Sequence, residues 1–422
     1  MRLPLFHTAK AANLTGISNR SAAKKATAVL TDMKIVSNKK IAQVVDNNKI
    51  RRAIFKNRNY LKNKWHNDNK NKDLDAIYFD GRKDQTIVDL NGHRIKKLEE
   101  HISLIQEPGS RYFGHISFTT SSKATDIASG ISSFLNQNEV DMTNIKVIGC
   151  DGTNCNTGWK GGIIRLVETQ LGKPLQWAVC YLHANEFPLR HLLQKQDGHT
   201  KGPYQYSGEI GSLLENCEKR PIVSFSKIET DLPDTNYKDL STDQQYLYRI
   251  CQAVSDDICP ADLAQTNPGK TSHSRWLTTA NRVLRLYVSV SEPSNNLKLP
   301  AKFIVKVYST MWFVTKAKPY LQFGARHLWQ TIYLLRQFAE TITAVVDKAI
   351  LNNAFYAHPK NILVAMLADE RKHIRELAVR RILKARNKPE GVRVFRIPNL
   401  NFEAQDYIDL IKWAECTITE PP

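Results

Sequence analysis

The sequence lacks the patterns that mark secreted or membrane-spanning proteins. Its seven cysteines have no regular spacing, so no disulfide framework is indicated and a reducing compartment is favoured. No run approaches the ~20 apolar residues of a membrane helix, and the apolar stretch FIVKVYSTMWFV is interrupted by Lys306. The first thirty residues contain no acid, but they lack the continuous apolar segment of a signal peptide. We expect a soluble protein of the nucleus or cytosol, with a transit peptide as the alternative.

Two familiar ligand-binding motifs are also missing. NPGKTS resembles the end of a phosphate loop, but Ala264 stands where that motif requires glycine, and no apolar strand precedes it. Cys180 and His183 could bind zinc, with Cys150 and Cys155 near each other in sequence, yet a structural zinc site needs four ligands and no second pair is evident. A packed cysteine and a hydrogen-bonded histidine are therefore the favoured interpretation.

Negative charge is scarce at the beginning of the chain. Residues 1–72 contain 17 Lys and Arg against 3 Asp, which gives them +14 of the formal net charge of +19. A segment of this composition binds polyanions because it releases counterions from phosphates. DNA is therefore the expected partner, and the alternative is a basic tail that only favours solubility.

The element pattern predicts a mixed α/β sheet. Residues 74–118 indicate three strands joined by turns at DGRKD and EPGS, and a helix is expected over 121–137. IKVIGC and LQWAVCYLH have the apolar character of buried strands, and each precedes a helix, in NTGWKGGIIRLVETQLGK and ANEFPLRHLLQ. Three antiparallel strands followed by parallel strands reached through helices resemble the ribonuclease H-like arrangement.

A chain of 422 residues is too long for one ordinary core, and its second half is mostly helical. Apolar stripes at helical spacing recur from about residue 215 onward. We predict four regions: a basic, mainly helical arm at 1–72, a ribonuclease H-like core at 73–215, a large helical insertion at 216–345, and a C-terminal helical region at 346–422 that completes the core.

Two aspartates follow predicted strands in the same way. Asp80 follows AIYF in the first strand, and Asp151 follows VIGC in the fourth. These strands are neighbours in a ribonuclease H-like sheet, so both carboxylates are expected at one rim. Adjacent carboxylates repel each other unless a cation separates them, and Mg²⁺ prefers carboxylate, water and phosphate oxygens. Two such ions about 4 Å apart can activate water and stabilise the leaving oxygen of a phosphodiester.

The alternative for each aspartate is a turn, because both stand in Asp-Gly pairs. Either pair alone favours the turn. Matching positions at two neighbouring strand ends favour the metal site instead.

Three stretches together resemble the core of hAT-superfamily transposases and the cellular proteins descended from them. They are CDGTNCNTGWKGGIIRLVETQ, QWAVCYLHANEFPLRHLL and HSRWLTTANRVLRLY, and the resemblance covers roughly residues 75–290. It implies that Asp80 and Asp151 are catalytic acids that hold Mg²⁺. It also matches Cys180 with His183 to a structural Cys-x-x-His motif on a strand, and it matches an Arg-Trp motif to Arg275 and Trp276.

The resemblance further implies a catalytic Glu on a helix after the insertion. Glu376 is the first choice, Glu370 the second and Glu340 the third, and no motif fixes one of them. The family's C-terminal dimerisation pattern and an N-terminal zinc finger are not recognisable. An inactive, domesticated relative that binds nucleic acid or protein is therefore the alternative to a transposase, and the oligomeric state stays open.

A basic helix near the C-terminus is a further candidate for DNA binding. Such a helix usually has a solvated face, but beside a nucleic-acid site it serves as a backbone clamp. Arg275 is expected either on a DNA phosphate or on an acid, while Trp276 is expected in the core. A third interpretation of the whole protein is a helical scaffold whose basic faces bind acidic proteins. The basic residues of this helix are Arg371, Lys372, Arg375, Arg380, Arg381, Lys384 and Arg386.

Overall fold

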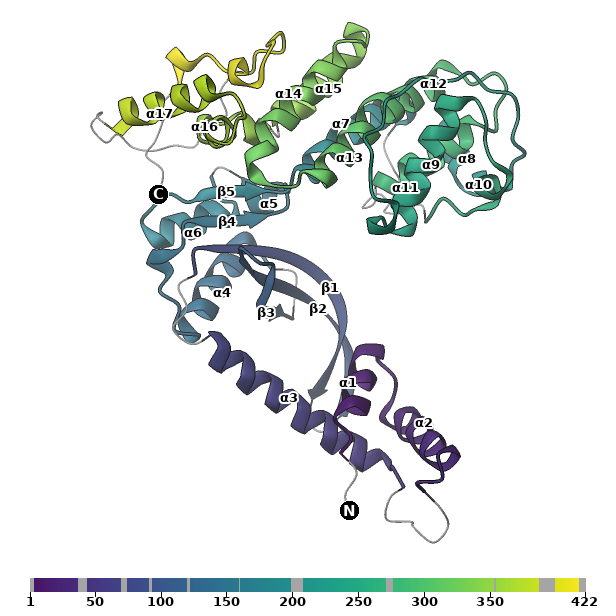
Figure 1. The fold of residues 1–422 in the computed structure, drawn as a ribbon, viewed down its shortest axis with the longest axis vertical. Helices are drawn as coiled ribbons and strands as arrows, with labels where there is room; N and C mark the ends of the chain where they lie inside the picture. Colours follow the sequence, from purple (N-terminus) through teal and green to yellow (C-terminus); the bar gives the residue numbers. More distant parts are fainter. Residues whose placement is uncertain are drawn as a thin grey trace. The chain divides into compact units, whose positions relative to one another are not determined.

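The computed structural model describes residues 4–36, 44–69, 74–90, 93–119, 122–158, 160–198, 208–270, 276–352, 354–386 and 399–416. The chain divides into two compact units, Met1–Asp73 with Leu135–Asp141, and Leu74–Phe134 with Met142–Pro422. The first division falls where the strongly basic composition ends. Figure 1 shows the elements of both units.

The described residues of the N-terminal unit form helices around a small core. A glycine in the left-handed region, Gly16, ends the first helix at φ 63°, and the Ser18 side chain accepts a hydrogen bond from the Ser21 N–H at the start of the second. The core consists mainly of alanines, so little of the third helix is buried. The helices are α1 (Phe6–Thr15), α2 (Asn19–Asp32) and α3 (Asn47–Asn69), and the buried core residues are Ala12, Ala22, Ala23, Val45 and Ile50.

The second unit contains a five-stranded mixed sheet in the order β3-β2-β1-β4-β5. β1 pairs antiparallel with β2, and β2 with β3, whereas β1 with β4 and β4 with β5 are parallel. The predicted sequence of antiparallel and then parallel strands is therefore confirmed. The strands are β1 (Ala76–Leu90), β2 (His93–Glu107), β3 (Arg111–Phe118), β4 (Val147–Cys150) and β5 (Gln176–Val179).

The predicted turn at DGRKD is wrong. Residues 80–84 lie inside β1 and pair with residues 99–103 of β2, and each of these two strands is 15 residues long. A long ladder of cross-strand contacts outweighs the local turn preference of an Asp-Gly pair. β1 connects to β2 through residues 91–92, which lie outside the described residues. The second predicted turn, EPGS, does connect β2 to β3, with Gly109 at φ 109°.

Helices pack against the sheet, and glycines allow close contacts. A Cβ on Gly130 of α4 (Ala124–Gln137) would lie 2.9 Å from the Phe118 ring of β3. The helix expected in NTGWKGGIIRLVETQLGK is split into α5 (Asn154–Thr157) and α6 (Ile163–Leu171). The split follows from close backbone packing, because a Cβ on Gly162 would lie 2.4 Å from the Gly158 nitrogen. The buried Glu168 of α6 accepts a hydrogen bond from the Trp177 indole of β5 at 2.9 Å.

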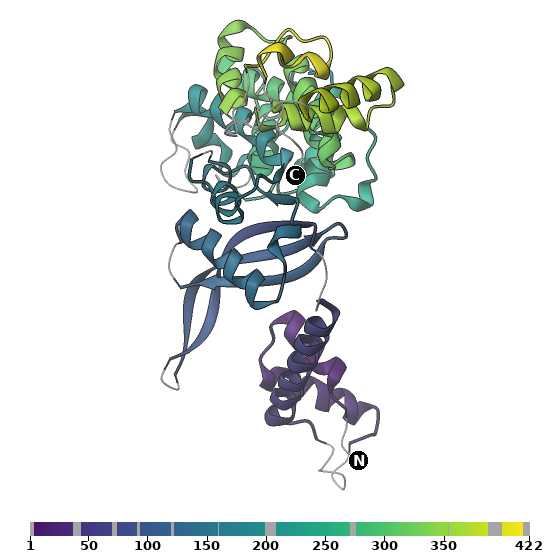
Figure 2. The same ribbon diagram turned by 90° about the vertical axis from the view of Figure 1, so that its left-hand side faces the viewer.

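The remaining described residues of this unit are mainly helical and lie next to the β4–β5 end of the sheet (Figures 1 and 2). A π-helical segment, Ile304–Ser309, joins α12 to α13. None of the helices in the described ranges is long and apolar enough to cross a bilayer. The helices are α7 (Tyr181–Asp197), α8 (Glu209–Leu214), α9 (Thr242–Asp256), α10 (Ala261–Gln265), α11 (Trp276–Tyr287), α12 (Asn295–Phe303), α13 (Thr310–Ala317), α14 (Gly324–Leu335), α15 (Glu340–Asn352), α16 (Pro359–Leu367) and α17 (Lys372–Arg386).

Candidate functional site at the ends of β4 and β5

The parallel pairing of β1 with β4 brings Asp80 and Asp151 to equivalent positions. The last paired residues are Tyr78 and Gly149, and each aspartate follows its paired residue by two positions, Asp80 inside β1 and Asp151 directly after the end of β4. Residues in register on neighbouring parallel strands share one face of the sheet, with the strands about 4.8 Å apart. Burial raises the pKa of the Cys150 thiol, and the charges of both aspartates add to this effect. Both carboxylates therefore lie near the end of β4.

Asp151 is held by a local turn. Its Oδ1 accepts hydrogen bonds from the Thr153 backbone N–H at 3.0 Å, the Thr153 hydroxyl at 2.8 Å and the Asn156 side-chain amide at 2.6 Å. Its Oδ2 lies 3.9 Å from Nε2 of His183. The small polar residues after Asp151 thus fix one carboxylate oxygen and leave the other on the side of the histidine.

Asp80 has a different environment. It is exposed within β1, opposite Ser103 of β2, and its carboxylate accepts no hydrogen bond from the described residues. The turn interpretation is therefore wrong for Asp80. The β1–β2 ladder continues before and after Asp80 and fixes its backbone position. The ladder is therefore a rigid support for a side chain that is exposed to solvent.

Cys180 and His183 do not lie on a strand, so that part of the prediction is wrong. β5 ends at Val179, Cys180 is the N-cap of α7, and His183 is the third residue of the helix. β4 and β5 pair over four residues. The Cys180 N–H adds one more bond, to the Cys150 carbonyl at 2.9 Å, before the chain turns into the helix. The helix brings His183 back over the carboxyl end of β4, next to Asp151.

The pKa of His183 is raised to about 9. Its contact with the Cys180 thiol is the main cause, burial opposes it, and the charges of Cys180, Glu186 and Asp151 add to it. Burial raises the pKa of Cys180, but interactions with His183 and with backbone N–H groups outweigh burial and lower it overall. An imidazolium beside Oδ2 of Asp151 balances part of the negative charge at the rim.

Glu186 is a titrating residue that the sequence did not reveal. It stands one helical turn after His183, and burial raises its pKa to about 7, against the opposing charge of His183. A glutamate in an ordinary amphipathic helix carries no sequence signal for such a shift. Its spacing of three residues from the histidine indicates only that the two side chains are neighbours on the helix.

Replacing Glu186 with Gln is expected to remove a pH-dependent loss of stability. The folded-state pKa lies above the unfolded value, so the wild-type side chain destabilises the fold as pH rises from about 4.5 to about 7. Relative to wild type, Glu186→Gln should gain up to about 3 kcal/mol of unfolding free energy between pH 5 and pH 7.5. Urea unfolding at both pH values measures this, with the exposed Glu209→Gln as control. An equal gain in both variants would contradict the assignment.

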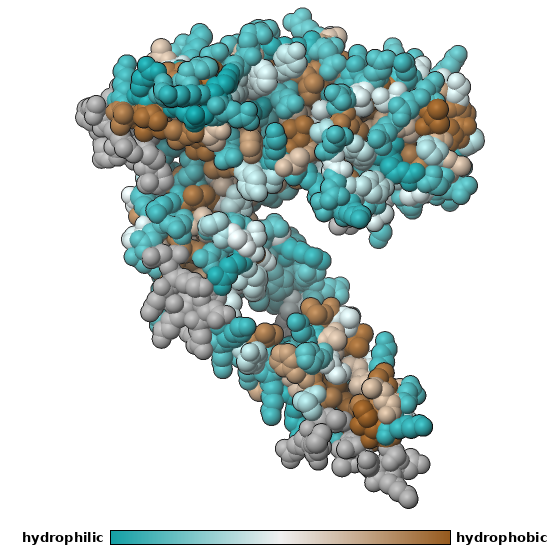
Figure 3. All heavy atoms as spheres, in the orientation of Figure 1, coloured by the Kyte–Doolittle hydropathy of each residue, from teal (hydrophilic) through white to brown (hydrophobic). Residues whose placement is uncertain are grey.

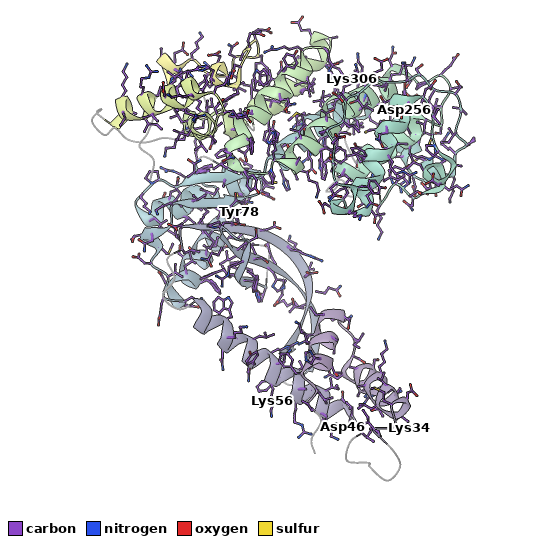
Figure 4. All side chains as sticks on the ribbon, in the orientation of Figure 1. Lys34, Asp46, Lys56, Tyr78, Asp256 and Lys306 are labelled. Carbon is purple, nitrogen blue, oxygen red and sulfur yellow. The ribbon has the colours of Figure 1, made fainter. Side chains whose placement is uncertain are left out.

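Tyr78 packs across Gly149 of the neighbouring strand. A Cβ on Gly149 would lie 2.3 Å from the Tyr78 ring, so only glycine fits opposite this tyrosine. Burial is the main reason that the pKa of Tyr78 is raised to about 12. Figure 4 labels Tyr78 on the sheet. This contact fixes the spacing of β1 and β4 two residues before the aspartates.

Gly149→Ala is expected to destabilise the fold by about 1–3 kcal/mol through overpacking. Tyr78→Ala in the same chain should relieve the clash, so the double variant should lose less than the sum of the two single losses. Chemical denaturation of the four proteins measures the coupling. Gly161→Ala is the matched control, because a Cβ there meets no atom within 4 Å. Strict additivity of the two substitutions would exclude the contact.

The candidate third acids lie on exposed positions. Glu376 of α17 is 53% exposed and lies 3.7 Å from Lys372, while Glu370 and Glu340 are also exposed. Among the residues that the structure describes, no three His, Cys, Asp or Glu side chains gather closely enough to hold a metal ion together. The third acid thus stays a prediction.

The basic residues of α17 fall into two groups. Arg375 donates to the carbonyls of residues 369 and 370 just before α17, and the Arg381 guanidinium stacks over the Trp413 ring of the C-terminal segment at 3.8 Å, so both are engaged within the protein. Lys372 and Arg380 are exposed. Trp276 is buried, as predicted, and Arg275 lies outside the described residues.

No protein-family model and no curated protein matches this chain. Strand order, the residues of the rim and the distribution of charge are therefore the observations that bear on function.

Proposed function

We propose that this chain is a DNA-binding protein related to hAT-superfamily transposases, with a ribonuclease H-like core that cleaves phosphodiesters. The strand order β3-β2-β1-β4-β5, with Asp80 and Asp151 each two residues beyond the last paired positions of β1 and β4, is the observation that carries this proposal. Asp151, the Cys180–His183 pair and Trp276 also follow one another in the order typical of that family. A nuclear location is part of the proposal.

The donor set at the rim fits Mg²⁺. Asp80 offers a solvent-exposed carboxylate, and Asp151 offers Oδ2, while the turn holds its Oδ1. Mg²⁺ is usually held by one or two carboxylates and completes its shell with water and phosphate. When bound, it would neutralise phosphate charge and activate water. Glu376, or else Glu370, completes the acid set in this proposal.

The protein's own residues orient this chemistry. Thr153 and Asn156 fix the rotation of the Asp151 carboxylate, and the β1–β2 ladder fixes the Asp80 backbone. His183 places a positive charge on the same side as Oδ2, where it attracts a phosphate oxygen. The exposed position of Asp80 keeps the rim open to a large substrate.

DNA binding is supported by the exposed face of α3. Figure 4 labels Lys56 on this helix, and Figure 3 shows both hydrophilic and hydrophobic residues on the visible surface of the N-terminal unit. No acidic residue occurs between Asn47 and Trp65. Two adjacent stripes at helical spacing are exposed along their whole length: Arg51, Phe55, Arg58 and Lys62, and Arg52, Lys56, Asn59 and Asn63.

These residue types suit a duplex. Arg and Lys neutralise phosphates, and Arg and Asn can donate two hydrogen bonds to the edge of one base in the major groove. Phe55 is 65% exposed on the same stripe and offers an apolar contact beside the basic residues. A long, exposed helix with no acid over residues 47–65 therefore offers both phosphate contacts and base contacts along one side.

A second candidate function is DNA binding without cleavage. The exposed basic face of α3 supports this candidate without any contribution from the aspartate rim. A nicking assay on supercoiled plasmid with Mg²⁺ separates the two candidates. Nicking that depends on Asp80 and Asp151 supports cleavage, whereas salt-sensitive binding with no nicking supports the second candidate.

A further inference from the structure

The connection between α1 and α2 has the length and the residues of a helix-turn-helix. Only three residues, Gly16 to Ser18, separate the two helices. Connections of three or four residues that contain glycine are typical of that motif. Gly16 lies in the left-handed region at φ 63°, which favours glycine, and Ile17 packs against the core of the unit. The turn is therefore anchored at its centre, and it sets the direction in which α2 leaves α1.

The core behind this turn holds the two helices together. Ala12 of α1 and Ala22 and Ala23 of α2 are buried, and their small side chains let the helices approach closely. α3 packs against both helices (Figure 1). The Thr27 hydroxyl donates to the Val45 carbonyl at 3.0 Å and accepts from the Val45 N–H at 3.2 Å, which ties α2 to the residues that lead into α3. One side of α2 is thus fixed in the protein, and the other side lies on the surface.

The exposed side of α2 is basic. Arg20, Lys24 and Lys25 are exposed over its first two turns, and within the described ranges they pair with no acid. No acidic residue precedes Asp32, the last residue of the helix. Val29, on the turn after the lysines, is 56% exposed. The exposed side is therefore positive over the first half of α2 and carries an apolar side chain beyond it.

These residues have the places that a recognition helix requires. In helix-turn-helix proteins the second helix lies in the major groove, and residues near its N-terminus contact base edges. Arg and Lys donate to the O6 and N7 atoms of guanine, and apolar side chains contact the methyl group of thymine. Arg20 lies in the first turn of α2, and Lys24 lies one turn further along the same side. Both side chains can therefore reach base edges when α2 enters the groove.

A hollow joins this side of α2 to the start of α3. It measures about 520 Å³ and lies between α2 and residues 44–47. Arg20 and Lys24 line it on one side, and Asn47 lines it on the other. Asp46 also lines it, but its Oδ1 accepts a hydrogen bond from the Lys49 N–H at 2.7 Å in the first turn of α3. The basic surface of α2 thus continues into the start of α3, so one duplex can contact both helices.

We propose that α1 and α2 form a helix-turn-helix that reads guanine-containing duplex DNA in the major groove, with Arg20 and Lys24 on base edges. This inference rests on the DNA binding proposed above, does not depend on cleavage, and adds a second reading helix to α3. The ordinary alternative is a solvated basic face that contacts phosphates without selecting a sequence. The two differ in whether recognition of a single guanine depends on a single side chain.

Methylation interference tests this assignment in the full chain. The wild-type protein first selects duplexes from a random-sequence library. These duplexes are methylated at guanine N7, which lies in the major groove, and the bound and free fractions are compared. Methylation of at least two guanines should block binding of the wild type. Arg20→Ala and Lys24→Ala should each lose the interference at one of them, and discrimination against substitution of that base pair should fall at least about tenfold.

Lys64→Ala is the matched control. Lys64 is exposed on α3, near the end that lies away from the hollow, and its replacement also removes one charge from a helix of the same unit. The interference pattern of this variant should be that of the wild type. Unchanged interference in both α2 variants, or none at any guanine in the wild type, would overturn the helix-turn-helix assignment and leave DNA binding standing. A wild-type chain that selects no duplex from the library would instead refute DNA binding itself, and this inference with it.

Discussion

Asp151→Asn and Asp80→Asn should each reduce Mg²⁺-dependent nicking of DNA by at least about a thousandfold, or ~4 kcal/mol of transition-state stabilisation. The loss is expected because an amide is a poor ligand for Mg²⁺ and brings no negative charge. Asparagine is preferred to alanine at position 151, since its side-chain oxygen can still accept the hydrogen bonds from Thr153 and Asn156. The fold should therefore survive while the chemistry is lost.

The nicking experiment has a matched control on the same strand. Asp84 is 52% exposed, forms an ion pair with Arg82 at 3.0 Å and lies four residues after Asp80. Asp84→Asn removes the same charge from the same ladder and should leave nicking unchanged. Nicking rates of wild type and the three variants on supercoiled plasmid, with thermal unfolding as a check of folding, measure the effect. Wild-type rates in both rim variants would reject the metal assignment.

The second large effect is a loss of affinity for DNA, expected when basic residues of α3 are replaced by neutral ones. The variant R51Q/R52Q/K56Q/K62Q keeps good helix formers but removes four exposed charges. The slope of log affinity against log salt should fall by about 3–4, since each lost phosphate contact contributes about 0.9. Affinity for duplex DNA near 50 mM salt should drop at least about a hundredfold. Fluorescence anisotropy over a salt series provides both quantities.

The control for α3 removes equal charge elsewhere. Lys219, Lys238, Lys270 and Lys298 are exposed in the helical part of the second unit, and their replacement by Gln should change the salt slope far less. Asn59→Ala with Asn63→Ala should spare non-specific affinity and reduce discrimination between sequences, because amides read base edges. If the two charge-matched variants lose affinity equally, α3 has no special function and only the net charge matters.

The sheet could be predicted because the residues of each strand themselves indicate a strand. IKVIGC and LQWAV are short apolar runs, and buried parallel strands have this composition. The length of β1 could not be predicted in the same way. The Asp-Gly pair at residues 80–81 carries a strong turn signal, and only pairing with residues 102–103, which lie 21 to 23 positions away along the chain, overrides it.

The rim was predicted in part for the same reason. Asp151 directly follows a short apolar strand in the sequence, so its position at the end of that strand could be predicted. The helical placement of His183 and the titration of Glu186 depend on where α7 begins and on what covers it, which is tertiary information. Arg285 shows the limit most clearly. A basic residue on an apolar helix is usually solvated or paired with an acid, and nothing in the sequence indicates that this one is buried on backbone carbonyls.

The pairing of β1 with β4 spans only three positions, from Ala76 opposite Val147 to Tyr78 opposite Gly149. Side chains alternate between faces along a strand, so parity between these positions and Asp80 decides which way that carboxylate turns. An insertion or deletion of one codon between them would send it to the opposite face, while the far tip of the hairpin could grow or shrink freely. A length change of a single residue would thus separate the two carboxylates without removing any strand from the sheet.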